Sequence, residues 1–379
     1  MARRRFDALA QLEEQRTKIQ PTIPVAAVDY WNELMKRLGT GNVIPIISNS
    51  LRCDHIFDMS SEQEQRPIAE KDNHGEHSVE PLDTLDELLA QMWAQDLGYP
   101  FPDRKSLARV SQYHLFEKCQ AIPQRAKEEY LAFLKKTLLD LVVKHHDPDA
   151  GERVDVEKHT FSHIVRELDM PPFRNKSEDS LRLLARLQKL KIYVTTSYYD
   201  FMEYALRAEG RSPRTQICFW TGPGVNLEDS HRPDRNYWPT PEEPVVLHLF
   251  GHEKYPSTMV LTEDDYVDFL IRVSQPVDPE DAILPLYLTQ ALASSTLLLL
   301  GYRLQEWDFR ILFRGIIHRQ LQDKPPDLRL AIQLRPGPED GVTDEYIQKA
   351  QAYLESYFDT SKFTVVWDDP DEFVKKLAR

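Results

Sequence analysis

The chain has 379 residues, of which 47 are basic and 61 acidic, so its formal net charge is −14 at pH 7. Hydrophobic residues make up 41% of the sequence, which is enough to build a core and excludes a disordered chain. The acidic balance argues against nucleic acid as a direct ligand, because a phosphate backbone binds clustered basic residues.

The three cysteines, Cys53, Cys119 and Cys218, are far apart and form no CxxC pair. We therefore expect neither a disulfide framework nor a zinc ribbon, and no metal site. Acidic and glutamine residues interrupt the region where a signal peptide would be apolar, and Pro285 and several polar residues interrupt the apolar run over 283–300. We expect a cytoplasmic protein without a secretion signal or a membrane span.

Helical patterns over residues 5–38 precede the first strand. Phe6, Leu9 and Leu12 form a narrow apolar stripe on a charged segment. Because a short helix is marginally stable in water without a packing surface, residues 1–40 are expected to be N-terminal helices that can serve in oligomerisation. Folding of the stripe onto the chain's own core remains an alternative.

The next segments predict one strand and then a long helical region. The apolar run over 43–47 predicts a buried parallel strand, so we assign 41–51 to the first strand and turn of a core. Apolar residues then recur at helical spacing, which predicts a helical insertion over 52–190. Its predicted helices are Leu82–Leu97, Ser106–Lys118, Gln124–His145 and Glu178–Lys189.

Strand and helix patterns alternate over 191–379, which we assign to the remainder of the core. The predicted strands are 191–196, 245–249, 296–300, 329–334 and 363–367. The predicted helices are 199–208, 264–273, 284–293, 308–322, 343–358 and 370–377. This alternation predicts an α/β fold, a Rossmann-like doubly wound parallel sheet with a helical insertion.

Polar residues follow four of the predicted strands. In a doubly wound sheet, ligands bind beyond the carboxyl ends of the strands. The residues at these turns are Ser48, Asn49 and Ser50, then Thr195, Thr196 and Ser197, then His248, Gly251 and His252, and finally Gly301, Tyr302 and Arg303. The alternative is that the Ser, Thr and Asn side chains only cap the helices that follow.

Taken in order, four segments resemble the sirtuin-like family, in particular its bacterial members that hydrolyse NAD in antiphage defence. The segments are VIPIISNSLR, YVTTSYYDFMEYAL, VVLHLFGHEKYPSTMVLTEDDYVDFL and TLLLLGYRLQEWDFRILFRGI. The resemblance implies NAD as substrate or ligand, a multimeric assembly and, in some relatives, an ATPase partner. It implies that the residues binding the cofactor are Ser48, Asn49, Ser50, Arg52, Thr195, Thr196, Tyr199, Asp200, Gly251, Gly301, Tyr302 and Arg303.

The sequence departs from the family pattern at the residues that carry the chemistry. Residues 48–50 replace a Gly-Ala-Gly turn, Ser197 replaces the Asn that holds the attacking water, and Phe250 stands in the position of the catalytic His. Tyr199 and Arg303 replace an Asp and a Ser. The cysteine pairs of deacylating sirtuins are missing, so deacylation is not expected.

These departures leave two hypotheses open. In the first, the chain is an NAD glycohydrolase in which His248 is the base and Ser197 or Thr196 positions the water. In the second, His248 is a core histidine and the chain is a catalytically degenerate nucleotide sensor or scaffold. A third hypothesis, which does not depend on these departures, is an unrelated nucleotide-processing α/β enzyme.

His159 and His163 share a helical face but have no evident third metal ligand.

Overall fold

The chain is described by a computed structural model. The residues described are 30–48, 51, 85–145, 147–170, 179–218, 220–221, 227–232, 234, 237–274, 283–302, 309, 311, 328–333, 344–359 and 363–379. Asn49, Ser50, Arg52 and Arg303 lie outside the described residues, as do the apolar stripe of the N-terminal segment and most of the helix predicted over 308–322.

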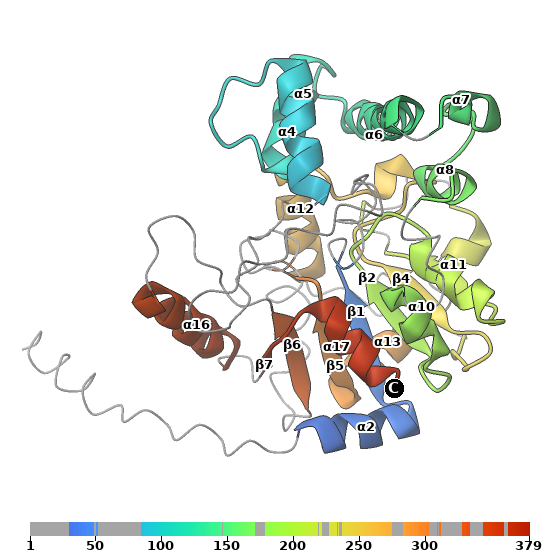
Figure 1. Cartoon of the computed structure of the whole chain (residues 1–379), viewed down its shortest axis with the longest axis vertical. Coiled ribbons are helices and arrows are strands. Elements are labelled where there is room, and N and C mark those ends of the chain that lie inside the picture. Colours follow the sequence, from blue (N-terminus) through green and yellow to red (C-terminus); the bar gives the residue numbers. More distant parts are fainter. Residues whose placement is uncertain are drawn as a thin grey trace, which may run out of the picture.

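Among the described residues, seven strands form one parallel sheet in the order β3-β4-β2-β1-β5-β6-β7 (Figure 1). The strands are β1 (Val43–Ile47), β2 (Ile192–Thr195), β3 (Arg214–Ile217), β4 (Val245–His248), β5 (Thr296–Leu300), β6 (Arg329–Gln333) and β7 (Thr364–Trp367). Because β1 lies between β2 and β5, the chain winds outward from β1 in both directions. The doubly wound parallel sheet predicted from the sequence is therefore confirmed.

The central strands are buried along their whole length, as parallel strands covered on both faces are. All five residues of β1 and all five of β5 are buried. The register pairs Ile47 with Leu300 between β1 and β5, and Thr195 with His248 between β2 and β4. The carboxyl ends of these four strands consequently lie level with one another, at one edge of the sheet.

Helices of the core pack around the sheet. They are α2 (Tyr30–Thr40), α10 (Ser180–Arg186), α11 (Phe201–Ala208), α12 (Glu263–Ser274), α13 (Leu286–Ser294), α16 (Asp344–Asp359) and α17 (Pro370–Leu377). α10 packs against α11 and α17, and α2 packs against β1. The ring of Trp31 on α2 meets that of Phe373 on α17 edge-on, with centroids 5.7 Å apart.

A group of helices, the helical block, gathers at the end of the molecule opposite α2 (Figure 1). It comprises α4 (Leu85–Leu97), α5 (Leu107–Glu117), α6 (Pro123–His145), α7 (Ala150–Arg153) and α8 (Phe161–Glu167). The block is bonded to the segment that follows β4: the Ser111 hydroxyl donates to the Leu261 carbonyl at 3.0 Å. The amide of Phe161 donates to the Glu253 carboxylate at 2.6 Å. The helical block therefore lies at the edge where the strands end.

Most elements agree with the sequence prediction to within a few residues, but β3, α7 and α8 were not predicted. β3 reads Arg-Thr-Gln-Ile, and its first two residues are only partly buried because it is the edge strand. α7 and α8 have four and seven residues, too short for a helical period to stand out. No helix among the described residues is both long and apolar enough to cross a membrane.

Candidate functional site

The turns after β1, β2 and β5 meet at the carboxyl edge of the sheet. The Ser48 hydroxyl donates to the carbonyl of Gly301 at 2.6 Å. The hydroxyl oxygens of Thr196 and Tyr302 are 3.2 Å apart, and the Thr196 amide donates to the Ile47 carbonyl at 3.1 Å. Four predicted site residues, from three separate segments, are thus brought together. Their role as ligands of a nucleotide remains a prediction.

Gly301 allows this close approach. Its φ is +78°, a left-handed conformation that glycine adopts without strain. A Cβ at this position would lie 2.7 Å from both the Leu51 amide nitrogen and the Ser48 hydroxyl oxygen. The turn after β5 therefore packs directly on the turn after β1.

Backbone packing also requires glycine at position 251. Its φ is +86°, and a Cβ would lie 2.1 Å from the carbonyl oxygen of Thr258. The requirement for glycine here comes from the backbone of the same connection. The cofactor contact assigned to Gly251 from the resemblance stays a prediction.

The turn after β2 is held by its own hydroxyls. The Ser197 amide donates to the Thr195 hydroxyl at 3.0 Å, and the Tyr199 amide donates to the Ser197 hydroxyl at 3.3 Å. These bonds lie within the turn and do not cap α11, whose N-cap residue Asp200 makes no capping bond with its side chain. A role of Ser197 in positioning water remains a prediction.

The helical block completes this side of the site. The ring of Phe161 on α8 lies 4.8 Å from that of buried Tyr199. The amide of Asp200 donates to the Ser162 hydroxyl at 3.1 Å. Burial, and then the negative charge of Glu203, raise the pKa of the Asp200 carboxyl. Two predicted site residues are thus in direct contact with α8.

His248 has protein partners on both ring nitrogens. Nδ1 lies 2.8 Å from the carbonyl oxygen of Ser197, and Nε2 lies 2.8 Å from Oε1 of Glu203. His248 and Glu203 are both 0% exposed. A carbonyl and a carboxylate can only accept, so both nitrogens donate and the ring is an imidazolium.

The pKa shifts agree with this ion pair. Burial works against charge on both groups, but the His248 cation outweighs it and lowers the pKa of Glu203 to about 2. Burial likewise opposes charge on His248, yet the Glu203 carboxylate keeps the pKa of this imidazole above its ordinary value. The Thr215 hydroxyl adds a hydrogen bond to Glu203 Oε1 at 2.8 Å. His248 therefore carries no free lone pair with which to accept a proton.

Phe250, in the position that the resemblance gives to the catalytic His, belongs to the core. Its side chain is 1% exposed. Its ring meets those of Tyr266 and Phe269 edge-on, with centroids 5.6 and 5.2 Å away. Packing against α12 accounts for this aromatic residue.

The structure adds two buried acidic residues that the sequence analysis did not name, Glu203 and Glu253, and it also buries His252, which the sequence analysis placed at the turn after β4 without a role. Glu203 lies at the acidic position of the motif after β2, so the motif itself could have identified it. His252 Nδ1 accepts from the Lys254 amide at 3.1 Å, while its Nε2 is buried without a partner among the described residues. Burial and the nearby His248 cation lower the pKa of His252 to about 3.

Glu253 joins the core to the helical block. Its carboxylate accepts the amides of Phe161 at 2.6 Å and Ser162 at 3.1 Å, and also the Ser162 hydroxyl. Burial raises the pKa of Glu253 to about 8. No sequence signal marks this residue, because its partners lie about 90 positions away along the chain.

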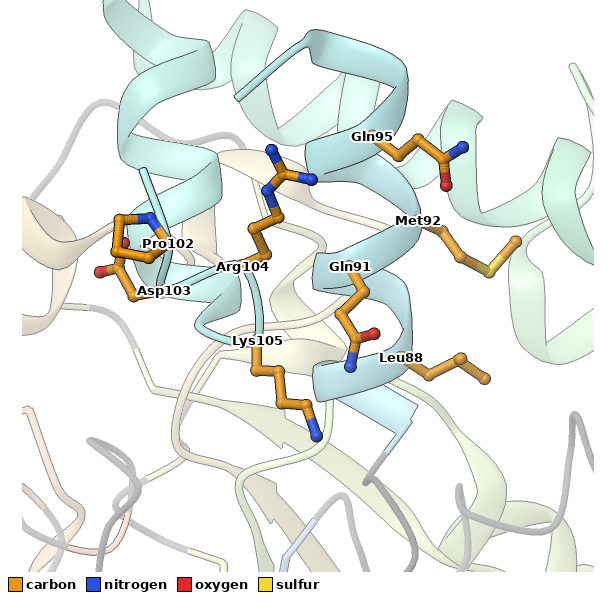
Figure 2. A pocket seen from close by; sticks show the side chains of 8 residues that line it. All are labelled: Leu88, Gln91, Met92, Gln95, Pro102, Asp103, Arg104 and Lys105. Carbon is orange, nitrogen blue, oxygen red and sulfur yellow. The ribbon is translucent and has the colours of Figure 1, made fainter. Parts of the chain in front are cut away.

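Two further features lie away from the sheet edge. A surface pocket of about 580 Å³ is formed within the helical block, between one side of α4 and the loop that carries Arg104 and Lys105 (Figure 2). The rings of His159 and His163 are 4.2 Å apart, but His159 Nδ1 accepts from the Asp155 amide. Neither feature contributes a residue to the converging turns.

A parallel doubly wound sheet with polar turns beside its central strand is the architecture of nucleotide-binding proteins. Comparison with known families makes this specific: residues 191–358 match the model of the SIR2-like domain. This match supports a sirtuin-like, NAD-binding fold for residues 191–358, and the resemblance to the sirtuin-like family is confirmed there. No curated protein matches the chain.

Proposed function

We propose that the chain binds NAD or an ADP-ribose-containing nucleotide at the carboxyl edge of β1, β2 and β5. We further propose that it acts as a nucleotide-binding sensor or scaffold subunit. The observation that carries the second part is the ion pair of His248 with Glu203, which occupies both ring nitrogens.

Binding is supported by the chemistry of the converging turns. Ser48, Thr196 and Tyr302 place three hydroxyl groups at the point where the chain winds outward in both directions. Hydroxyls and backbone amides at such a point bind ribose and phosphate oxygens. α8 of the helical block contacts Tyr199 and Asp200 beside this edge, so it would shield part of a bound nucleotide from water.

Hydrolysis requires more than binding. Cleavage of the nicotinamide glycosidic bond passes through an oxocarbenium-like state, and the attacking water needs a base that can accept its proton. An imidazolium with two hydrogen-bonded nitrogens cannot accept one. The geometry therefore favours the sensor or scaffold over a glycohydrolase that uses His248 as base.

Isothermal titration calorimetry with NAD and with ADP-ribose tests the binding. We expect Thr196→Val or Tyr302→Phe to weaken binding about 3–10-fold, the effect of one lost hydrogen bond. Ser294→Ala, at an exposed position at the end of α13, is the matched control and should bind as the wild type does. Absence of binding to either nucleotide, or equal affinity of all four proteins, contradicts the proposed site.

An NAD glycohydrolase of antiphage defence is the second candidate, and Asp200 is the observation that favours it. This carboxyl, with its raised pKa, follows directly on the turn after β2, and a carboxylate of raised pKa can serve as a general base. Purified protein with NAD, with and without phage-infected lysate, should then release nicotinamide, and Asp200→Asn should reduce release at least about 100-fold. No release under either condition favours the sensor or scaffold.

A further inference from the structure

Three side chains with metal-binding atoms meet at the junction of α5 and α6, inside the helical block. His114 lies in the last turn of α5, Cys119 lies in the connection, and Glu129 lies in the second turn of α6. His114 is 4% exposed and Cys119 is 0% exposed. The Glu129 side chain is 37% exposed, so the group has one side open to water.

The donor atoms face one another. His114 Nε2 is 2.7 Å from Glu129 Oε2, and Cys119 Sγ is 3.6 Å from the same oxygen. One donor atom from each residue lies within 4.8 Å of the other two. Donors around a tetrahedral zinc ion are about 3.3–3.8 Å apart, given its bond lengths of about 2.0–2.3 Å. A small widening of the His114–Glu129 contact admits an ion.

We propose that His114, Cys119 and Glu129 form a site for a divalent ion of the zinc class. Imidazole nitrogen, thiolate sulfur and carboxylate oxygen are the donor types that Zn²⁺ takes from proteins. The three residues leave a fourth position for water on the open side of Glu129. Hard cations such as Mg²⁺ and Ca²⁺ prefer sets made of oxygen alone and do not fit this group.

The neighbouring contacts suit this role. The Arg125 guanidinium donates to Glu129 Oε1 at 2.7 Å, which orients the carboxylate and leaves Oε2 toward the other two donors. His114 Nδ1 is buried without a partner among the described residues, so a single protein hydrogen bond holds the ring, and an ion can replace it. Nε2 donates to the Glu129 carboxylate in the ion-free chain; when an ion binds, the neutral ring would carry its proton on Nδ1 and offer the lone pair of Nε2 to the ion.

Ion binding must displace one proton. Zn²⁺ binds cysteine as the thiolate, and the Cys119 sulfur lies 3.6 Å from Glu129 Oε2. When the Zn–S bond forms, the thiol proton leaves to solvent, and nothing is oxidised or reduced. The bound ion would join the end of α5 to α6 and so fix the hairpin that these helices form.

The proposal revises the expectation of no metal site drawn from the missing CxxC pairs. The ligands follow a His-x4-Cys-x9-Glu spacing that matches no common zinc motif, and only the turn between the helices brings them together. The site lies outside the region that matches the SIR2-like domain, residues 191–358.

Equilibrium dialysis of the full chain against zinc, followed by elemental analysis, tests the site. We expect one zinc ion per chain and a higher melting temperature with zinc than with chelator. Cys119→Ser and His114→Ala should each weaken binding by about 10–100-fold or more. Two controls should bind zinc as the wild type does: His163→Ala, which changes the pair of His159 and His163, and Cys218→Ser, which removes the other buried thiol.

Cobalt provides a second readout, which for the wild-type protein does not depend on the folding of any variant. Wild-type protein loaded with Co²⁺ should show a sulfur-to-metal charge-transfer band, and Cys218→Ser should keep it, whereas folded Cys119→Ser should lose it. A wild-type chain that takes up no zinc overturns the proposal, and so does Co²⁺-loaded wild type without a thiolate band. Undiminished zinc binding by folded Cys119→Ser and His114→Ala would also overturn the proposal.

Discussion

His248 and Glu203 form an ion pair with no exposed surface. Removal of one partner leaves the other charge buried and uncompensated, which costs about 3–5 kcal/mol. We therefore expect His248→Ala to lower the free energy of unfolding by that amount, as measured by urea denaturation. His231→Ala, at a partly exposed histidine, should cost much less.

The two hypotheses for His248 differ in this measurement. A histidine that acts as general base can be replaced with folding intact and with a loss of NAD cleavage of roughly 10²–10⁴-fold. A His248→Ala protein of wild-type stability would contradict the structural role argued here. Glu203→Gln combined with His248→Ala should be less destabilised than the sum of the single variants, because the buried unpaired charge is gone.

His252 gives the fold a pH dependence whose sign follows from its pKa. The pKa is lowered from its ordinary value of 6.5 to about 3, so between these values the unfolded chain binds a proton that the folded chain does not. The contribution of neutral His252 to the free energy of unfolding is complete above pH 6.5. It is lost as the pH falls toward 3, by up to about 1.4 kcal/mol per pH unit. The positive charges of His248, His231 and Lys254 add to the lowering of this pKa, and the negative charge of Glu203 opposes it.

His252→Asn provides the test, because asparagine keeps an acceptor for the Lys254 amide and does not titrate. Urea denaturation at pH 6.5, 5.5 and 4.5 should show a smaller loss of stability for the variant than for the wild type. Parallel curves for the two proteins would argue against a neutral buried His252.

At the residue scale, the sequence predicted the parts of the site that depend on topology. Polar residues at strand ends must converge once the strands are parallel and adjacent, and Ser48, Thr196 and Gly301 do so. The pairing of His248 with Glu203 follows instead from side-chain directions on β4 and α11, which the alternation of helices and strands does not specify. For the same reason the sequence left the protonation of His248 open.

Lys127 and Asp265 connect two elements, α6 of the helical block and α12 of the core. Their ion pair is 2.9 Å long, with side chains 3% and 9% exposed. Asp265 Oδ2 also accepts the amides of Leu261 and Thr262, each at 3.0 Å, so the carboxylate caps α12 as well. The Lys127 ammonium lies 5.4 Å from the centroid of the Trp220 ring, which stabilises the cation further.

Replacement of Lys127 by Met should therefore cost about 3–5 kcal/mol of unfolding free energy, because the Asp265 charge stays buried without its partner. Lys349→Met removes an exposed i,i+4 partner of Glu345 and should cost no more than about 0.5 kcal/mol. Chemical denaturation compares the two variants. Equal, small losses would show that the helical block is not held to α12 by this pair.

Elements with a clear apolar run or hydrophobic periodicity were predictable from the sequence. Short elements that depend on contacts with distant residues were not. The strands Val43–Ile47 and Thr296–Leu300 are continuous apolar runs, and the structure begins and ends them at the predicted residues. α8 has seven residues, and Glu253 of the core accepts the first amides of this helix. An element that depends on a partner so far along the chain leaves no local pattern.

At the scale of the whole molecule, the helical block and the sheet edge form one unit. From the sequence we expected residues 52–190 to be an insertion beside the core. In the structure, Phe161 and Ser162 of this segment contact Tyr199 and Asp200 at the predicted site. A change in the block, such as binding of a partner protein, would thus act directly on the proposed nucleotide site, which suits the proposed sensor.

We expect the chain to be a homo-oligomer in which the helical block takes part. Phe101 and Phe116 are 54% and 61% exposed and, with Tyr99 and Tyr113, line a surface hollow of about 720 Å³. Exposed aromatic groups of this kind mark interaction surfaces. The charge of −14 per chain does not prevent assembly, because salt screens surface charges beyond about 10 Å.

Light scattering at micromolar concentration should give a mass that is a multiple of 44.3 kDa. Phe101→Ser combined with Phe116→Ser should lower the number of subunits per particle, because an apolar interface then loses two aromatic anchors. Trp238→Ser, which changes an even more exposed ring between β3 and β4, is the control. A chain beginning at Val25 isolates the contribution of the N-terminal segment. A full-length monomer would refute self-assembly, and an unchanged oligomer in the double variant would place the interface elsewhere.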